Sequence, residues 1–171
     1  MDIYMIILRL IHFFAGTFWV GASALLVLVI SPAIKKMGPD GVKFMQNLNR
    51  MPSFGMFFPI LALLTVISGA LMYWEVSDGF NADWMELDSS IVLSIGAVAG
   101  ILAFLHGGGT LGRASGKMNE LAKAVEGQGG PPTPEQQAEL IETAAYFELH
   151  SRISFGLMIV AVAGMASARY F

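Results

Sequence analysis

Four long apolar runs constrain this chain more than any other feature of its sequence. They cover residues 3–30, 54–74, 90–106 and 153–168. About 20 apolar residues are enough for a helix to cross the hydrocarbon core of a bilayer. A soluble fold of this size has too little interior to hide four such runs. The runs therefore predict an all-α, polytopic membrane protein: one domain, residues 1–171, built as a bundle of four transmembrane helices.

Composition excludes several other classes of protein. Hydrophobic residues make up 55% and charged residues 13% of the 171 residues, and this charged share is about half that of soluble domains. The absence of Cys excludes disulfide scaffolds, thiolate zinc sites, iron–sulfur clusters and covalently attached haem. The formal net charge of −3 argues against a nucleic-acid partner. The lipid bilayer is the expected environment.

The charges between the runs predict the orientation. The first connection carries Lys35, Lys36, Lys43 and Arg50, whereas residues 75–89 contain five acidic residues and no Lys or Arg. The third connection is basic again, with Arg113, Lys117 and Lys123. Basic connections stay in the cytoplasm, so we expect both termini outside. The first run is too long for the apolar core of a signal peptide and no basic segment precedes it, so we interpret it as a mature helix.

Two connections contain further helix signals. A turn signal at Gly38-Pro39-Asp40-Gly41 is followed by apolar residues at helical spacing, which predicts a short helix on the inner surface. Residues 107–152 are predicted to extend the third and fourth helices as a cytoplasmic hairpin that is broken at residues 127–132. Thr133-Pro134-Glu135-Gln136 then has the pattern of a capping box that restarts the helix.

The first helix carries one polar face. Arg9, His12, Gly16, Trp19 and Ser23 follow one another in steps of three and four, and residues so spaced share a face. Ionisable groups in a membrane span are costly and face the bundle interior or a pore. The imidazole of His12 is therefore either a hydrogen-bonded core group or a ligand of haem or a metal. Arg9 either reaches the outer headgroups or holds haem propionates.

Counting from the helix midpoints predicts which residues share a depth. His12 falls at the level of Gly69, Gly96 and Met165, so Met165 is a candidate second axial ligand for a haem on His12. His106 falls about 16 Å further inward by the helical rise, which is too far for one haem to join it to His12. His106 and His150 open a second possibility, an inner haem or metal site; the alternative is a pair of interfacial histidines without a ligand.

Two motifs carry a resemblance to known membrane proteins. The segment Leu10-Ile11-His12-Phe13-Phe14-Ala15-Gly16-Thr17-Phe18-Trp19-Val20-Gly21, followed by Pro32, resembles the first helix of the copper-resistance D (CopD)-like and HemJ-like group of small four-helix bacterial membrane proteins. Residues 67–74 resemble the end of their second helix. The resemblance implies a multi-pass protein of the bacterial inner membrane whose first-helix histidine binds haem b or handles copper. Only His12 matches the motif position.

These observations lead to one expected function and three alternatives. We expect a haem b-binding protein that transfers electrons, alone, as a homodimer or as a subunit of a larger membrane redox complex. A copper-handling CopD-like protein, a HemJ-like protoporphyrinogen oxidase and a structural membrane subunit without a cofactor are the alternatives. The substrate, if the protein is a component of an oxidoreductase, is not indicated by any motif.

The orientation can be tested by labelling. A Cys introduced at Asp83 is expected to react with a membrane-impermeant thiol reagent in intact cells, because the acidic second connection lies outside. A Cys introduced at Lys43 is expected to react only after the cells are opened, since the basic first connection lies inside. The reverse labelling pattern would show that the orientation is inverted.

Overall fold

The computed structural model describes residues 3–171, and for residue 39 the backbone alone. The described part contains helices and no strand, which confirms the all-α fold. The elements in chain order are α1 (Ile3–Leu25), η1 (Leu26–Ile30), α2 (Ser31–Met37), α3 (Pro39–Arg50), α4 (Pro52–Val76), α5 (Ala82–Met85), α6 (Asp88–His106), η2 (Gly107–Leu111), α7 (Gly112–Gly127), α8 (Pro134–Ser167) and η3 (Ala168–Tyr170).

Four helical stretches are long and apolar enough to cross a membrane: Ile3–Met37, Pro52–Val76, Asp88–Gly127 and Pro134–Tyr170. By length and composition they identify a multi-pass membrane protein. Each contains one of the predicted runs, but the third and fourth continue far beyond it. At 1.5 Å per residue, 37 residues reach about 55 Å, well beyond the roughly 30 Å of hydrocarbon. Large apolar side chains cover the outside of the bundle; Phe13, for example, is 65% exposed.

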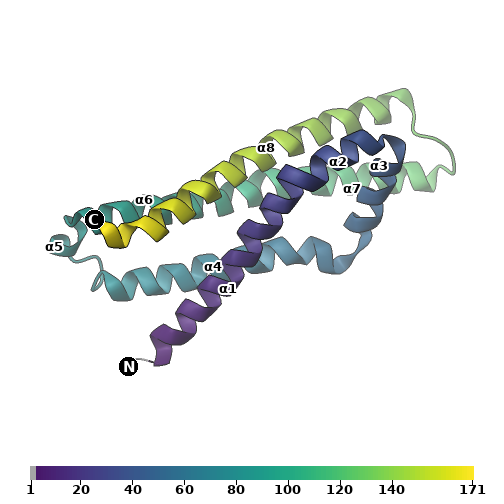
Figure 1. Ribbon diagram of the computed structural model, residues 1–171. Coiled ribbons are helices and arrows are strands. Elements are labelled where there is room, and N and C mark those ends of the chain that lie inside the picture. Colours follow the sequence, from purple (N-terminus) through teal and green to yellow (C-terminus); the bar gives the residue numbers. More distant parts are fainter. Residues whose placement is uncertain (1–2) are drawn as a thin grey trace.

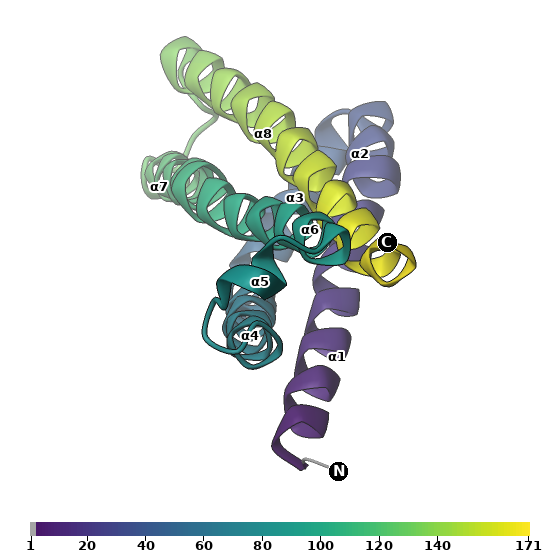
Figure 2. The ribbon, with the colours of Figure 1, turned by 90° about the vertical axis from the view of Figure 1, so that its left-hand side faces the viewer.

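The four spanning helices are arranged as two pairs. Helix α1 packs mainly on α4, and α6 packs mainly on α8. Both termini and α5 lie at one end of the molecule, whereas α3 and the turn between α7 and α8 lie towards the other (Figure 1). Figure 2 shows that the first turns of α1 project away from α6 and α8. The first turns of α1 therefore take no part in the contact between the two pairs, whereas α4 meets α6 close to α5, where Tyr73 OH is 2.5 Å from Ser94 Oγ.

A small buried cluster joins the two pairs at mid-bundle. It contains one residue from each spanning helix: Trp19 from α1, Ala62 from α4, Ala103 from α6 and Met158 from α8. The indole of Trp19 supplies most of the apolar surface, and the two alanines allow the helices to approach it. Trp19, which the sequence placed on the polar face of the first helix, is thus a packing residue of the bundle interior.

Glycines bring the backbones of α6 and α8 into direct contact. A Cβ atom at Gly96 would lie 2.9 Å from the carbonyl oxygen of Ala161 and 2.9 Å from the amide nitrogen of Met165. A Cβ atom at Gly164 would lie 2.8 Å from the Cα atom of Gly96. These neighbours are backbone atoms that cannot move aside, so Gly96 and Gly164 allow the two helices to pack closely.

The first helix does not end at Ser31-Pro32, where the sequence suggested its end. The helix continues to Met37 because a π-helical turn over Leu26–Ile30 precedes Pro32. Proline lacks an amide hydrogen and its ring collides with the carbonyl four residues earlier, and a wider turn accommodates both effects. The chain breaks instead at Gly38, whose φ of +58° glycine adopts without strain.

The connection between α7 and α8 has the predicted form. The helix breaks after Gly127, and α8 begins at a capping box in which the Gln136 amide donates to Thr133 Oγ1 at 3.2 Å and the Thr133 amide donates to Gln136 Oε1 at 2.9 Å. An ion pair of 2.8 Å between Lys117 and Glu139 joins α7 to α8. The sequence pattern therefore located both the break and the restart; the cytoplasmic position of this hairpin stays a prediction.

The α6–α8 contact generates a stability prediction. Gly96→Ala is expected to destabilise the bundle by about 1–3 kcal/mol, because the added methyl group collides with backbone. Gly156→Ala, on the partner helix α8 and with nothing within 4 Å of the added Cβ, is the matched control and is expected to be neutral or slightly stabilising. Denaturant or thermal unfolding in detergent measures both variants. Equal stability of the two variants would contradict the close contact.

Candidate functional site

His12 lies on α1 and its imidazole faces α4. The Nδ1 atom is 2.8 Å from the backbone carbonyl oxygen of Thr65 and 3.5 Å from Ser68 Oγ. A carbonyl oxygen only accepts hydrogen bonds, so Nδ1 carries the hydrogen and donates it. The hydroxyl of Ser68 donates in turn to the Leu64 carbonyl oxygen at 2.5 Å. The imidazole is therefore held in one tautomer and one orientation by the backbone of α4.

This tautomer leaves the Nε2 atom of His12 with a free lone pair. No residue of the described chain forms a hydrogen bond with Nε2. A metal-binding imidazole commonly donates its other ring nitrogen to a backbone carbonyl, which fixes the ring and raises the basicity of the binding nitrogen. The His12–Thr65 hydrogen bond has this form and leaves Nε2 as the ring nitrogen with an available lone pair.

Gly69 provides the space that the imidazole occupies. A Cβ atom at Gly69 would lie 2.8 Å from His12 Cε1 and 3.0 Å from His12 Nδ1. The prediction that His12 and Gly69 lie at one depth is confirmed. The imidazole of His12 occupies the space that a side chain at position 69 would need. Gly16, one turn further along α1, faces Thr65 with an ordinary spacing of 3.4 Å from a Cβ atom to Thr65 Cγ2. The α1–α4 contact at this level therefore depends on glycine at one position only.

The other two residues predicted for the outer site lie differently. Arg9 is exposed, one turn before His12 on α1. Met165 is half-buried in the α6–α8 interface, where its Cε atom lies 3.8 Å from the Cβ position of Gly100. The contacts described for Met165 are thus with α6, whereas those of His12 are with α4. His12 and Met165 therefore belong to different helix pairs, although they were predicted to lie at one depth.

The structure brings His106, the last residue of α6, together with His150 in the middle of α8. His106 Nε2 is 2.9 Å from His150 Nδ1, and His106 Nδ1 is 2.7 Å from Ser154 Oγ. The ring of Tyr146 stacks on the other side of His150, with 4.1 Å between the ring centroids. A π-helical turn of Gly107–Leu111 begins directly after His106. The chain Ser154–His106–His150 is therefore a continuous hydrogen-bonded link between the two helices.

The distance of 2.9 Å between His106 Nε2 and His150 Nδ1 is that of a hydrogen bond. Two nitrogens bound to one tetrahedral metal ion at about 2.0 Å each are about 3.3 Å apart, which is wider than the observed 2.9 Å. Within residues 3–171, no group of three or more His, Asp or Glu side chains is placed to hold a metal ion. His106 and His150 thus use their facing nitrogens on each other, and their partners are separate from those of His12.

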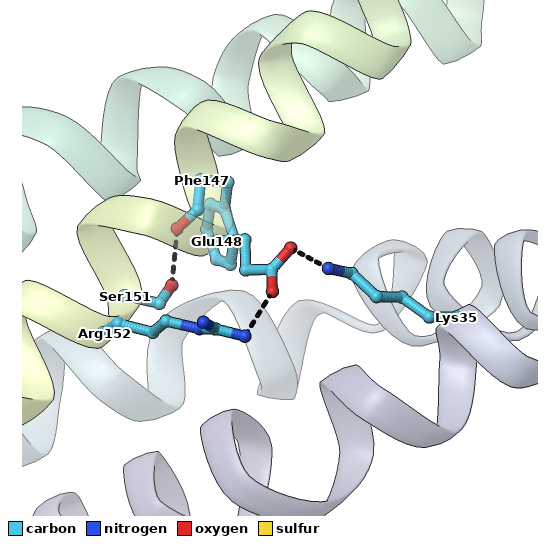
Figure 3. Close-up of polar contacts among 5 residues, drawn as sticks. All are labelled: Lys35, Phe147, Glu148, Ser151 and Arg152. Carbon is cyan, nitrogen blue, oxygen red and sulfur yellow. Dashed lines mark hydrogen bonds and ion pairs between the residues drawn. The ribbon is translucent and has the colours of Figure 1, made fainter.

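The sequence analysis did not predict a charged cluster that joins α2 to α8. Glu148 on α8 binds Lys35 of α2 at 2.5 Å and Arg152 of α8 at 2.8 Å (Figure 3). Its carboxylate precedes the apolar run 153–168 and is 21% exposed. The hydrogen bond from Lys35 holds the pKa of Glu148 below its usual value, against the opposing effect of burial. The four-residue spacing to Arg152 is visible in the sequence, but the link to Lys35 requires the fold.

Comparison with known proteins adds no relative to this picture. No protein-family model matches the chain, and neither the curated proteins nor the solved structures contain a significant match. The arguments for function therefore depend on the residues and contacts described above.

The His12 contact predicts one tautomer that can be observed directly. In protein labelled with ¹⁵N-histidine, the neutral His12 ring is expected to carry its hydrogen on Nδ1 and not on Nε2, because the Thr65 carbonyl oxygen accepts a hydrogen bond from Nδ1–H. Gly69→Ala is expected to abolish this pattern by displacing the ring. Gly21→Ala, on α1 with nothing within 4 Å of the new Cβ atom, is expected to keep it. A protonated Nε2 in the unmodified protein would refute the geometry.

Proposed function

We propose that this chain is a haem b-binding protein of the bacterial inner membrane that transfers electrons, with His12 as an axial ligand. One observation carries the proposal: within an apolar span, Nδ1–H of His12 is bound to a backbone carbonyl and Nε2 has no described partner. The motif around His12, which resembles the first helix of CopD-like and HemJ-like proteins, supports the same assignment.

The residues around His12 suit an imidazole ligand. The Thr65 carbonyl fixes the ring, and its hydrogen bond increases the electron density on Nε2. Gly69 lets the ring lie against the α4 backbone without displacement. Arg9, one turn towards the N-terminus, is exposed and has a guanidinium suited to pairing with a carboxylate. When bound, haem b supplies a one-electron redox centre whose potential depends on its axial ligand and nearby charges.

The proposal assigns His12 and no second ligand. The side chain of Met165 is packed against α6, and His106 and His150 are hydrogen-bonded to each other. The second axial ligand of the haem would therefore come from a second copy of the chain or from another redox subunit. The electron-transfer role follows from the chemistry of the centre, and no substrate is assigned.

Copper handling is the second candidate, because imidazole also binds copper. The sequence contains no M-x-x-M or H-x-H cluster, and the described chain holds no group of three ligating His, Asp or Glu residues. A single imidazole suits an axial position on haem better than it suits a copper site, which needs several protein ligands. Haem is therefore the preferred cofactor of this proposal, and copper, a HemJ-like oxidase and a cofactor-free subunit are alternatives for the test.

The visible spectrum of detergent-purified protein, produced with ample haem, tests the proposal. The unmodified protein is expected to show a Soret band that shifts on reduction. His12→Ala is expected to lose or shift this band while the protein still inserts into the membrane. His106→Ala is the matched control and is expected to keep the band, because its partners lie on α8. Arg9→Ala is expected to lower haem retention or the midpoint potential, since a nearby cation favours the reduced centre.

Three outcomes would contradict the proposal. Unmodified protein without any Soret band excludes haem, and metal analysis then decides whether copper is bound. A band that is lost equally in His12→Ala and His106→Ala would show that the loss reflects general destabilisation. Rescue of a haem-auxotrophic strain would replace electron transfer with a HemJ-like oxidase activity.

A further inference from the structure

An apolar groove lies between the inner end of the first spanning helix and α8. Val27 and Leu28 of η1 and Pro32 of α2 form one wall, and Phe155 and Arg152 of α8 form the other. The groove has a volume of about 370 Å³, which is within the range of ligand-binding clefts. Four of the five lining residues are apolar and suit a hydrocarbon chain. The fifth, Arg152, suits the polar headgroup of a lipid.

The groove coincides with an irregularity of the first helix. Val27 and Leu28 belong to the π-helical turn that precedes Pro32. Such turns are wider than regular α-helix and often occur at functional sites. Pro32 itself lines the groove and has no amide hydrogen to satisfy, so an apolar occupant beside it leaves no backbone donor unpaired.

The charges at the groove favour an anion. Glu148 is bound by Lys35 on one side and by Arg152 on the other, as Figure 3 shows. Two cations share one carboxylate, which leaves one positive charge in excess. Each cation uses part of its donor capacity on Glu148 and retains further N–H groups. Glu148 therefore holds two basic side chains close together with donors available for a second anion.

We propose that this groove binds one anionic phospholipid. The acyl chain lies against Val27, Leu28 and Phe155, and the phosphate accepts hydrogen bonds from the N–H groups of Arg152 and Lys35 that Glu148 leaves unused. The position suits the inner leaflet, because the residues belong to the ends of two spans at the side predicted to be cytoplasmic, where anionic lipids attract basic residues. The proposal does not depend on haem at His12, whose partners are on α4.

Native mass spectrometry of the protein in detergent, titrated with lipid, tests this site. The dissociation constant of the first bound phosphatidylglycerol is compared with that of phosphatidylcholine with the same acyl chains. One basic residue near a membrane surface is worth about fivefold in the affinity for an anionic lipid. Phosphatidylglycerol is therefore expected to bind at least about fivefold more tightly. Arg152→Gln and Lys35→Gln are each expected to reduce this preference about fivefold.

Two further variants separate the site from general effects. Lys43→Gln removes an exposed basic residue on α3 whose ion-pair partner is Asp40, and it is expected to keep the preference. Arg152→Lys keeps the charge and is expected to retain most of the preference, which shows that loss in Arg152→Gln is not due to misfolding. Val27→Phe narrows the groove and is expected to weaken the binding of both lipids.

The alternatives give different results. Equal affinities for the two lipids in the unmodified protein would overturn the proposal. An equal loss in Lys43→Gln and Lys35→Gln would replace the site with unspecific surface attraction. Inorganic phosphate that displaces phosphatidylglycerol at millimolar concentration would reassign the cluster as a site for free anions.

Discussion

The absence of water in hydrocarbon is the constraint on which the polar part of this structure depends, because each polar group must find its partner within the chain. Most hydroxyl groups of the spans satisfy this requirement within their own helix: Ser23, Thr65, Ser68, Ser94 and Ser167 donate to carbonyl oxygens three or four residues earlier. The three histidines instead form hydrogen bonds across helices. Their partners therefore define which helices are paired, and they make His12 Nε2 an informative exception. Ser90 Oγ is buried and also has no partner among the described residues.

Much of the architecture could be predicted because it is written in local patterns. Apolar runs, the Thr133–Gln136 capping box and the break after Gly127 each depend on neighbouring residues. The shared depth of His12 and Gly69, and of Gly96 and Met165, followed from the helical rise alone. The proximity of His106 and His150 followed from the same count. Depth is predictable because every helix crosses the same thickness of membrane.

Rotation about the helix axes could not be predicted in this way. Met165 shares the depth of Gly96, but its side chain points into the α6–α8 interface, because close contact at Gly96 and Gly164 fixes the rotation of α8. The first helix continues past Pro32 because of a π-helical turn over Leu26–Ile30, and no residue pattern predicts such a turn. The Lys35–Glu148 pair joins residues more than a hundred positions apart. Each of these features is decided by packing between helices rather than by the sequence of one helix.

The two candidate sites belong to different parts of the bundle, and the pairing of helices explains why. His12 depends on α1 and α4, which are in contact at His12, Gly16, Thr65 and Gly69. The groove proposed for a lipid lies between η1 and α2 on one side and α8 on the other. Glu148 of α8 is linked to α2 through Lys35, and Arg50 and Glu126 join α3 to α7 at 2.8 Å. Ion pairs that are half exposed contribute little stability, so these links orient the two helix pairs more than they hold them together. A ligand at the groove would add contacts where the protein itself has few, whereas a ligand at His12 meets an imidazole already fixed by backbone.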